Sequence, residues 1–464
     1  MESVIIIVFV MGYLAITLEH NLKLDKLIPA LIMMAVCWAL VALGVDSFTN
    51  WFDSSKHGLV DGFAAMAHDD KLHLVEETLL HHLGKTAEIL VFLLGAMTIV
   101  EIIDYFDGFS TIKGYVNFKS KKKLLWMFSI LAFILSAIID NLTATIVLIS
   151  ILQKIVKKRE DRIWFAGLTI IAANAGGAFS PIGDVTTTML WIGDKVSTGM
   201  LFTYLFIPSL LCMIVPTFIA TFLPAFKGEI DFDEHEVEKT KSQHSARMLY
   251  LGLGAILFVP IFKTVTHLPP YVGMMLSLAV VATFAEIYSR SKFSLTDFNT
   301  SESDANAHHS PFHHSLSKIE MPSILFFLGI LMAVAALESL GILFNFADNL
   351  KQGIPLMGSE LEGTVVSDLV VILLGIGSAI IDNVPLVAAS LGMFSEGLDN
   401  PLWHFIAFSA GTGGSMLIIG SAAGVVAMGM EKIDFFWYLK KISWLALIGF
   451  LIGSAAFVIL REFI

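Results

Sequence analysis

Cysteine and charge are both scarce in this sequence. The 464 residues include only two cysteines, and both lie inside apolar runs, which argues against a disulfide framework or a thiolate metal site. Charged residues make up 15% of the chain, whereas ordinary soluble domains contain about 25%. With 56% hydrophobic residues and a mean hydropathy of +0.77, the chain is predicted to be an all-α polytopic membrane protein.

Apolar runs that approach the length of a membrane span recur along the chain. A span needs about 20 apolar residues, and such runs occupy residues 4–18, 27–45, 89–103, 201–223, 248–262, 271–287, 324–343 and 442–460. The first run lacks a basic start and a small-residue cleavage site, so we expect a retained span rather than a signal peptide.

Lysine and arginine orient the predicted spans, because they accumulate on the cytoplasmic side of a membrane. Basic clusters lie at residues 23–26, 113–123, 154–162, 227–247 and 440–441. Ten full crossings, with two hairpins excluded, place all of these clusters on one face. This count predicts that both termini lie outside.

Two apolar segments are predicted to enter and leave the membrane on the same side. In residues 124–152 the only charge is Asp140, and basic clusters flank both ends. A single helix of that length would reach ~43 Å and leave one cluster on the wrong side, so we expect a re-entrant hairpin that turns at Asp140 and Asn141. Residues 369–394 contain only Asp382 and have acidic flanks, which predicts a second hairpin that enters from outside.

The two hairpins carry an internal repeat. Residues 136–141 and 378–383 are identical, and the glycine-rich segment 174–183 parallels 411–420. Five crossings per half would insert the second copy upside down, so we predict inverted-topology repeats, each with a re-entrant hairpin and a broken transmembrane helix. The predicted organisation is a first repeat at 1–223 (hairpin 124–152, broken helix 163–193), a cytoplasmic linker at 224–247, and a second repeat at 248–464 (hairpin 369–394, broken helix 403–430, polar loop 289–322).

Asp140 and Asp382 need a reason to lie within the membrane. A charged carboxylate at the bilayer centre costs at least ~2.5 to 3.5 kcal/mol and usually faces a cavity or a partner. These acids could be structural and bind helix ends at the hairpin tips, or they could bind a small hard cation. The matched settings of the two acids favour a cation site.

Oxygen-bearing side chains lie in the predicted broken helices, where glycine and proline interrupt the helical pattern. Hard cations prefer such oxygen ligands. The first half offers Asn174, Ser180, Asp184, Thr186 and Thr187, and the second offers Thr412, Ser415 and Ser421. Burial near other carboxylates favours the protonated form of an acid, so a proton and a cation would compete. Asp140 and Asp184 are the leading pair, with Asp382 next.

These motifs make the chain similar to the NhaD family of sodium/proton antiporters, within a superfamily that also includes arsenite permeases and dicarboxylate transporters. The resemblance covers the chain from about residue 88 to the end. It implies exchange of cytoplasmic Na⁺ or Li⁺ for external protons in pH homeostasis, without a cofactor, by a homodimer with a moving transport domain. The implied Na⁺ ligands are Asp140, Asn141, Asn174, Asp184, Asp382 and Asn383, and further ion-site residues are Thr143, Thr186, Thr187, Ser378, Ser415 and Ser421.

Two alternative functions remain at this point. A proton-coupled permease for arsenite or a small carboxylate would share the layout, although two hairpin aspartates would repel an anion. An intramembrane aspartyl protease is a remote alternative, because Gly183-Asp184 and Tyr105-Phe106-Asp107 only partly resemble its motifs. The short loops and the lack of a transit-like segment favour a bacterial inner membrane over a plastid membrane.

Overall fold

The protein consists almost entirely of helices. The computed structural model describes residues 1–464 except 54–57, 114–117, 231–243, 294–309, 344 and 346–365. Its α-helices, in chain order, are α1 (Glu2–Thr17), α2 (Glu19–Leu22), α3 (Leu27–Leu43), α4 (His68–Tyr105), α5 (Ser110–Lys113), α6 (Lys121–Ile139), α7 (Asn141–Ile155), α8 (Arg159–Ala178), α9 (Val185–Ile192), α10 (Thr198–Ala220), α11 (Ser245–Thr266), α12 (Pro270–Phe293), α13 (Pro311–Lys318), α14 (Met321–Ser339), α16 (Asp368–Ile381), α17 (Asn383–Met393), α18 (Pro401–Gly413), α19 (Ala422–Glu431), α20 (Phe435–Lys441) and α21 (Ser443–Leu460). A two-stranded antiparallel sheet pairs β1 (Phe52–Asp53) with β2 (Gly58–Leu59).

Within the residues that the structure describes, seven helices are long and apolar enough to cross a membrane, which confirms the prediction of an all-α polytopic membrane protein. They are α4, α6, α10, α11, α12, α14 and α21. Helices α1 and α3 are apolar but shorter, with 16 and 17 residues. The predicted total of ten crossings stays a prediction.

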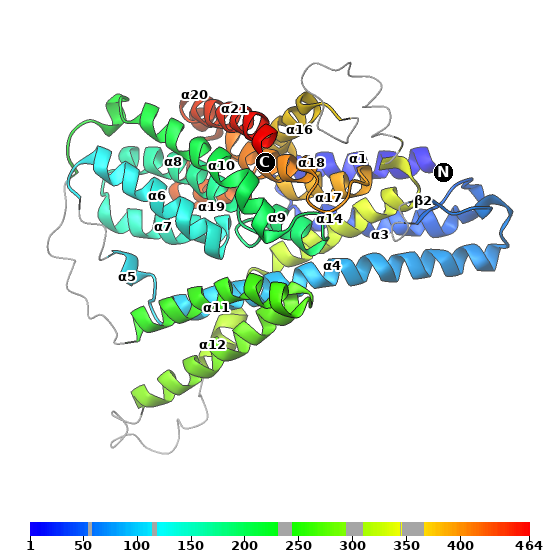
Figure 1. Ribbon diagram of the computed structural model, residues 1–464, viewed down its shortest axis with the longest axis horizontal. Coiled ribbons are helices and arrows are strands. Elements are labelled where there is room, and N and C mark those ends of the chain that lie inside the picture. Colours follow the sequence, from blue (N-terminus) through cyan, green and yellow to red (C-terminus); the bar gives the residue numbers. More distant parts are fainter. Residues whose placement is uncertain (54–57, 114–117, 231–243, 294–309, 344, 346–365) are drawn as a thin grey trace.

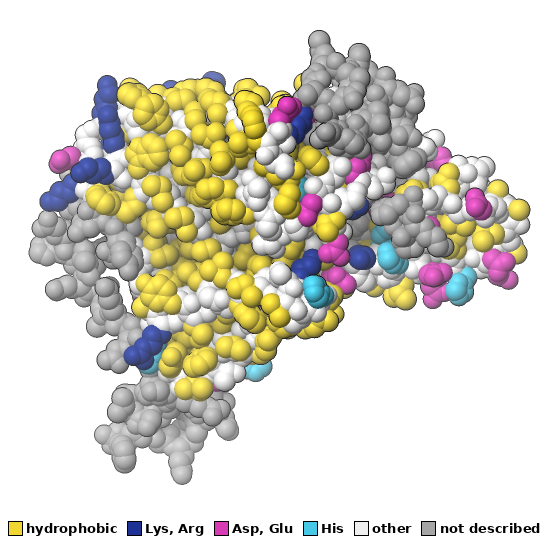
Figure 2. All heavy atoms as spheres, viewed as in Figure 1, with side chains coloured by type: hydrophobic (Ala, Val, Ile, Leu, Met, Phe, Trp, Pro, Cys, Tyr) yellow, Lys and Arg dark blue, Asp and Glu magenta, His cyan; other side chains and the backbone are white. Residues whose placement is uncertain are grey.

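Apolar, basic and acidic side chains occupy different parts of the surface along the long axis of the molecule. Figure 2 shows hydrophobic side chains over most of the middle of this face, most of the visible lysine and arginine toward the end where α5 lies, and most of the visible acids toward the other end. An apolar middle between polar ends is typical of a membrane protein. The basic end is the one expected to face the cytoplasm.

Helices α8 and α18 are interior helices that contact each other; Figure 1 shows α18 near the middle of the long axis and α8 beside α6 and α7. Every residue from Phe165 to Ala178 and from Leu402 to Gly413 is buried. A helix that is buried on all sides belongs to the interior of a large protein. The described helices around these two include α6, α7, α9, α10, α17 and α19, whereas α11 and α12 pack together against α4 at one side.

Two helices occupy segments that we did not predict to be helical. Helix α4 begins at His68, well before the apolar run at 89–103. Its first half is polar, so hydropathy did not reveal it, and it has no proline to end the helix. Helix α13 lies in the segment 289–322, which we predicted to be a polar loop, and α12 also reaches into that segment. The loop prediction was therefore too long at both ends, since hydropathy alone cannot detect a polar helix.

Two pairs of helices meet at single aspartates. Helices α6 and α7 join at Asp140, and α16 and α17 join at Asp382, in the segments where we predicted hairpins. Helix α8 ends before α9 begins at Val185, and α18 is followed by a short 3₁₀ helix at Gly414–Met416 before α19. In these two described segments, a helix pair that meets at an aspartate is followed by an interrupted helix.

Glycine is required where each interrupted helix touches its neighbouring pair. A Cβ atom on Gly176 would lie 2.2 Å from the Phe133 carbonyl oxygen, and one on Gly413 would lie 2.1 Å from the Gly375 carbonyl oxygen. No side chain fits at such distances. Gly176 and Gly413 hold equivalent places in the repeated sequence, as do Phe133 and Gly375, so the two halves pack in the same way at this point.

Candidate ion-binding site

The aspartates between the paired helices have the same unusual backbone. Asp140 has φ 94° and ψ 156°, and Asp382 has φ 74° and ψ 145°. A positive φ costs a non-glycine residue of order 1–3 kcal/mol, but each carboxylate caps the helix that follows. Asp140 accepts hydrogen bonds from the Thr143 N–H (2.7 Å) and hydroxyl (2.8 Å). Asp382 accepts one from the Asn383 N–H at 2.8 Å.

The second segment of each interrupted helix begins with a matched capping residue. Asp184 precedes α9 with φ −146° and ψ 147°, and Ser421 precedes α19 with φ −148° and ψ 151°. The Asp184 carboxylate accepts from the Thr186 N–H at 3.0 Å, and the Ser421 hydroxyl accepts from the Gly424 N–H at 3.2 Å. The halves therefore share geometry but differ in charge.

A buried hydrogen-bond network joins both helix pairs to both interrupted helices. The Asn141 amide donates to the Asp184 carboxylate (2.8 Å) and to the Asn174 side-chain oxygen (3.0 Å). The Asn383 amide donates to Asp184 at 3.1 Å, and the Asn174 amide donates to the Ser421 hydroxyl at 3.0 Å. All five side chains belong to residues that are at most 5% exposed. Asp184 is thus held between the two aspartate junctions.

A small cavity lies beside this network. Its volume is about 60 Å³, and its lining includes Asp140, Asn141, Asp184, Asp382 and Asn383. That volume holds a few water molecules or a partly hydrated ion. Within the described part of the chain, no three His, Cys, Asp or Glu side chains gather as a conventional metal site. The available ligands are the mixed carboxylate, amide and hydroxyl oxygens that alkali cations accept.

Lys26 also reaches this cavity, which the sequence analysis did not foresee. We placed Lys26 in a cytoplasmic basic cluster. Its ammonium lies 3.6 Å from the Asp382 carboxylate and 4.6 Å from the centre of the Phe326 ring. Two features of the sequence could have identified this pair. Lys26 stands directly before the apolar run of α3, and we predicted no basic partner for the buried acids.

Of the eight predicted hydroxyl residues, only Thr143 lines the cavity; Thr186, Ser421 and five others do not. The hydroxyls of those five others bond to nearby backbone groups: Ser180 accepts from the Ile182 N–H, whereas Thr187, Ser378, Thr412 and Ser415 donate to the carbonyls of Asp184, Gly375, Phe408 and Thr412. These bonds satisfy backbone groups that an interrupted helix leaves free. Thr188, which we did not predict, does line the cavity.

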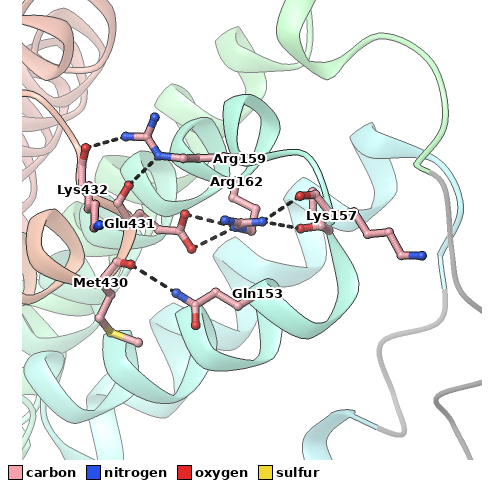
Figure 3. Close-up of polar contacts among 8 residues, drawn as sticks. Gln153, Lys157, Arg159, Arg162, Met430, Glu431 and Lys432 are labelled. Atoms are coloured by element: carbon pink, nitrogen blue, oxygen red, sulfur yellow. Dashed lines mark hydrogen bonds and ion pairs between the residues drawn. The ribbon is translucent and has the colours of Figure 1, made fainter.

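A polar clamp holds the far end of α19 against the first half of the chain (Figure 3). The Arg162 guanidinium donates to both carboxylate oxygens of Glu431 at 3.0 Å, and Arg159 donates to the carbonyls of Glu431 and Lys432. Gln153 donates to the Met430 carbonyl at 3.3 Å. Cations at the carboxyl end of a helix stabilise its dipole, so the end of α7 and the start of α8 hold α19.

A corresponding contact joins the end of α9 to the second half. The Lys195 ammonium donates to the Glu396 carbonyl at 3.1 Å and lies 4.8 Å from the centre of the Trp403 ring. Burial lowers the pKa of Lys195, and Glu396 and Glu338 partly oppose this shift. The Asp399 carboxylate accepts from the Ser197 N–H at 2.6 Å. The two halves are therefore joined at both interrupted helices.

Comparison with known proteins gives consistent matches over most of the chain. Residues 6–399 match the CitMHS family, described as citrate transporter. Sodium/proton antiporter 1 of Arabidopsis thaliana is 40% identical over 456 residues, which cover 97% of this chain and 71% of that protein. Sodium/proton antiporter 2 of the same plant is 36% identical, covering 98% and 99%.

A bacterial relative supports the same assignment. The Na⁺/H⁺ antiporter NhaD of Vibrio parahaemolyticus is 34% identical over 379 residues, covering 78% of this chain and 87% of that protein. These relatives are transporters, so nothing in the comparisons supports the protease alternative. The chain therefore belongs to the citrate transporter family and is a membrane transporter of the NhaD type.

Proposed function

We propose that this protein exchanges Na⁺ or Li⁺ for protons, and that cation and proton bind in competition to Asp140 and Asp184. The single observation that carries the proposal is the position of Asp184, which accepts from Asn141 of one helix pair and Asn383 of the other beside a cavity lined by two further acids. The names of the Arabidopsis and Vibrio relatives support sodium/proton antiport.

The proposed architecture is a pair of inverted repeats whose re-entrant hairpins, α6 with α7 and α16 with α17, meet near the membrane midplane. Support comes from the matched backbone of Asp140 and Asp382, the matched caps Asp184 and Ser421, and the equivalent glycine contacts. Broken helices at such a repeat interface bind coupling ions in secondary transporters. Helix α6 is long enough to span a membrane, so cysteine accessibility at its ends tests the hairpin.

Exchange follows from occupancy of one site by one of two cations. With Na⁺ bound, the carboxylates of Asp140 and Asp184 supply negative charge, and Asn141, Asn174 and Thr143 supply neutral oxygens nearby. When protons bind these carboxylates, the charge that holds Na⁺ is lost. We infer that the site opens to one side of the membrane at a time and changes sides only when Na⁺ or protons are bound. Each release of Na⁺ on one side is then coupled to the return of protons from the other side. The proposed direction is Na⁺ outward and H⁺ inward.

A permease for citrate or another small carboxylate is the second candidate, because the matched family is described as citrate transporter. The cavity does not favour an anion. Asp140, Asp184 and Asp382 line it, and Lys26 is the one basic side chain among the lining residues that the structure describes. A volume of about 60 Å³ also suits a small cation better than a tricarboxylate.

The proposal is tested in proteoliposomes with a pH dye inside acid-loaded vesicles. Addition of external Na⁺ or Li⁺ should alkalinise the lumen, whereas K⁺, citrate and arsenite serve as comparison solutes. Absence of any cation response together with citrate or arsenite uptake would move the protein to a permease function. An equal response to K⁺ would indicate a general salt effect rather than selectivity for small cations.

Assembly and location are further proposals. We propose a homodimer in which the part that contains α6–α9 and α16–α19 moves against the rest, because the Arg162 and Lys195 contacts join these helices across the two halves. The bacterial inner membrane stays a prediction, since the relatives come from a plant as well as from bacteria. Cross-linking in native membranes and cell fractionation test these points.

A further inference from the structure

Asp140 and Asp382 occupy equivalent backbone positions but have different partners. Asp140 accepts two hydrogen bonds from Thr143, one from its N–H and one from its hydroxyl. The equivalent residue three positions after Asp382 is Pro385, which has neither an N–H nor a hydroxyl. The second carboxylate therefore lacks both donors that the first one has.

The ammonium of Lys26 supplies a partner for the Asp382 carboxylate instead. It lies 3.6 Å from the Asp382 carboxylate, and the side chains of Lys26 and Asp382 are only 23% and 14% exposed. The ammonium also lies 4.6 Å from the centre of the Phe326 ring, at cation–π distance. Lys26 comes from the start of α3 and Phe326 from α14, so elements outside the helix pair hold the cation in place.

Lys26 and Asp382 also lie where two hollows meet. Both residues line the central cavity, and both line a second hollow of about 450 Å³ between the α1–α2 region and α20, which includes Glu19 and Phe436. A cation that entered the central cavity from this second hollow would meet the Lys26 ammonium first. Among the three acids, Asp382 is the one whose carboxylate is paired with a described lysine.

We propose that Lys26 is a built-in cation that occupies the ion position of the second half. This inference rests on the proposed function and refines it. The first half, with Asp140 and Asp184, binds the transported cation, whereas the Lys26 ammonium permanently neutralises Asp382. The second half also has Ser421 where the first has Asp184, so one fixed charge balances one acid. The protein accordingly binds one exchangeable Na⁺ per chain.

The test measures bound Na⁺ without measuring transport. The melting temperature of the detergent-solubilised full chain is recorded at pH 8.5 against Na⁺ concentration, with choline holding ionic strength constant. Stabilisation grows as RT ln(1 + [Na⁺]/Kd) for each site, so the slope against log [Na⁺] above Kd reports the number of sites. Lys26→Gln should double the slope because Asp382 becomes free to bind a second Na⁺. Lys23→Gln, at an exposed lysine nearby, should keep the wild-type slope.

A double variant keeps the test decisive if Lys26→Gln does not fold. Lys26→Gln with Asp382→Asn removes both charges together and should restore the single-site slope. A Lys26→Gln slope equal to that of the wild type, or a doubled slope in the double variant, overturns the inference. A wild type with no Na⁺-dependent stabilisation contradicts the proposed function as well, which separates the two failures.

Discussion

Replacement of Asp184 by asparagine removes the charge at the centre of the proposed site while keeping the size of the side chain. The carboxylate accepts from the amides of Asn141 and Asn383 and from the Thr186 N–H. Hydrogen bonds to a charged group contribute about 1.5–3 kcal/mol and neutral ones about 0.5–1.5 kcal/mol, and an asparagine would also set one amide donor against another. We expect a loss of about 1 to 3 kcal/mol of stability, which leaves the protein folded.

The effect on ion binding should be much larger than the effect on stability. A unit charge about 4 Å from a cation contributes about 4 kcal/mol at an effective dielectric constant of about 20. Since 1.4 kcal/mol is about tenfold in affinity, Na⁺ binding should weaken by about 1000-fold and exchange should fall below detection. The assay is the vesicle pH dye, with equal amounts of reconstituted protein and circular dichroism as the folding check.

Asp194→Asn is the matched control for this experiment. Asp184 caps the start of α9, and Asp194 follows the end of that helix. The Asp194 side chain is 76% exposed, so its replacement should leave exchange near the wild-type rate. Exchange above about a tenth of the wild-type rate in Asp184→Asn would refute the reasoning, because a thousandfold weaker site cannot support it.

Three further substitutions test the surroundings of the site. Thr143→Val should weaken Na⁺-driven exchange while Thr143→Ser retains most of it, as measured by the apparent Na⁺ KM, and equal loss in both would contradict a role for the hydroxyl. Gly176→Ala should lower the melting temperature, because overpacking should reduce the free energy of unfolding by about 1–3 kcal/mol. Gly84→Ala should leave the melting temperature unchanged, because the space around Gly84 is open. Arg162→Met should cost about 3–5 kcal/mol because it leaves Glu431 buried and unpaired, and adding Glu431→Gln should recover part of that loss of thermal stability; no recovery would argue against the ion pair.

Much of the helical pattern near the site could be predicted because the sequence marks it twice. The identical segments at 136–141 and 378–383 contain both aspartates where paired helices meet, and the glycines of 174–183 and 411–420 lie where helices are interrupted. A lone acid in an apolar run and a glycine pair are local signals. Each follows from a local cost: an acid in an apolar run needs a partner or a cavity, and a Cβ atom at Gly176 or Gly413 would clash with a backbone carbonyl.

The partners across the fold could not be predicted in the same way. Lys26 contacts Asp382, which is more than 300 positions away in the chain, and no local pattern encodes such a contact. Ser378 and Thr412 have the right chemistry for an ion site, but their hydroxyls bond to the backbone. Helix α13 is short and polar, and so escapes a hydropathy criterion.

The measurement that tests the central claim most directly is the apparent KM for Na⁺ as a function of pH in proteoliposomes. Competition between Na⁺ and a single proton at one site predicts that the KM rises about tenfold for each unit of pH below the titration of the site, while the maximal rate at saturating Na⁺ stays constant. A KM that does not change with pH, with a maximal rate that falls instead, would contradict competition and place proton and cation on separate sites.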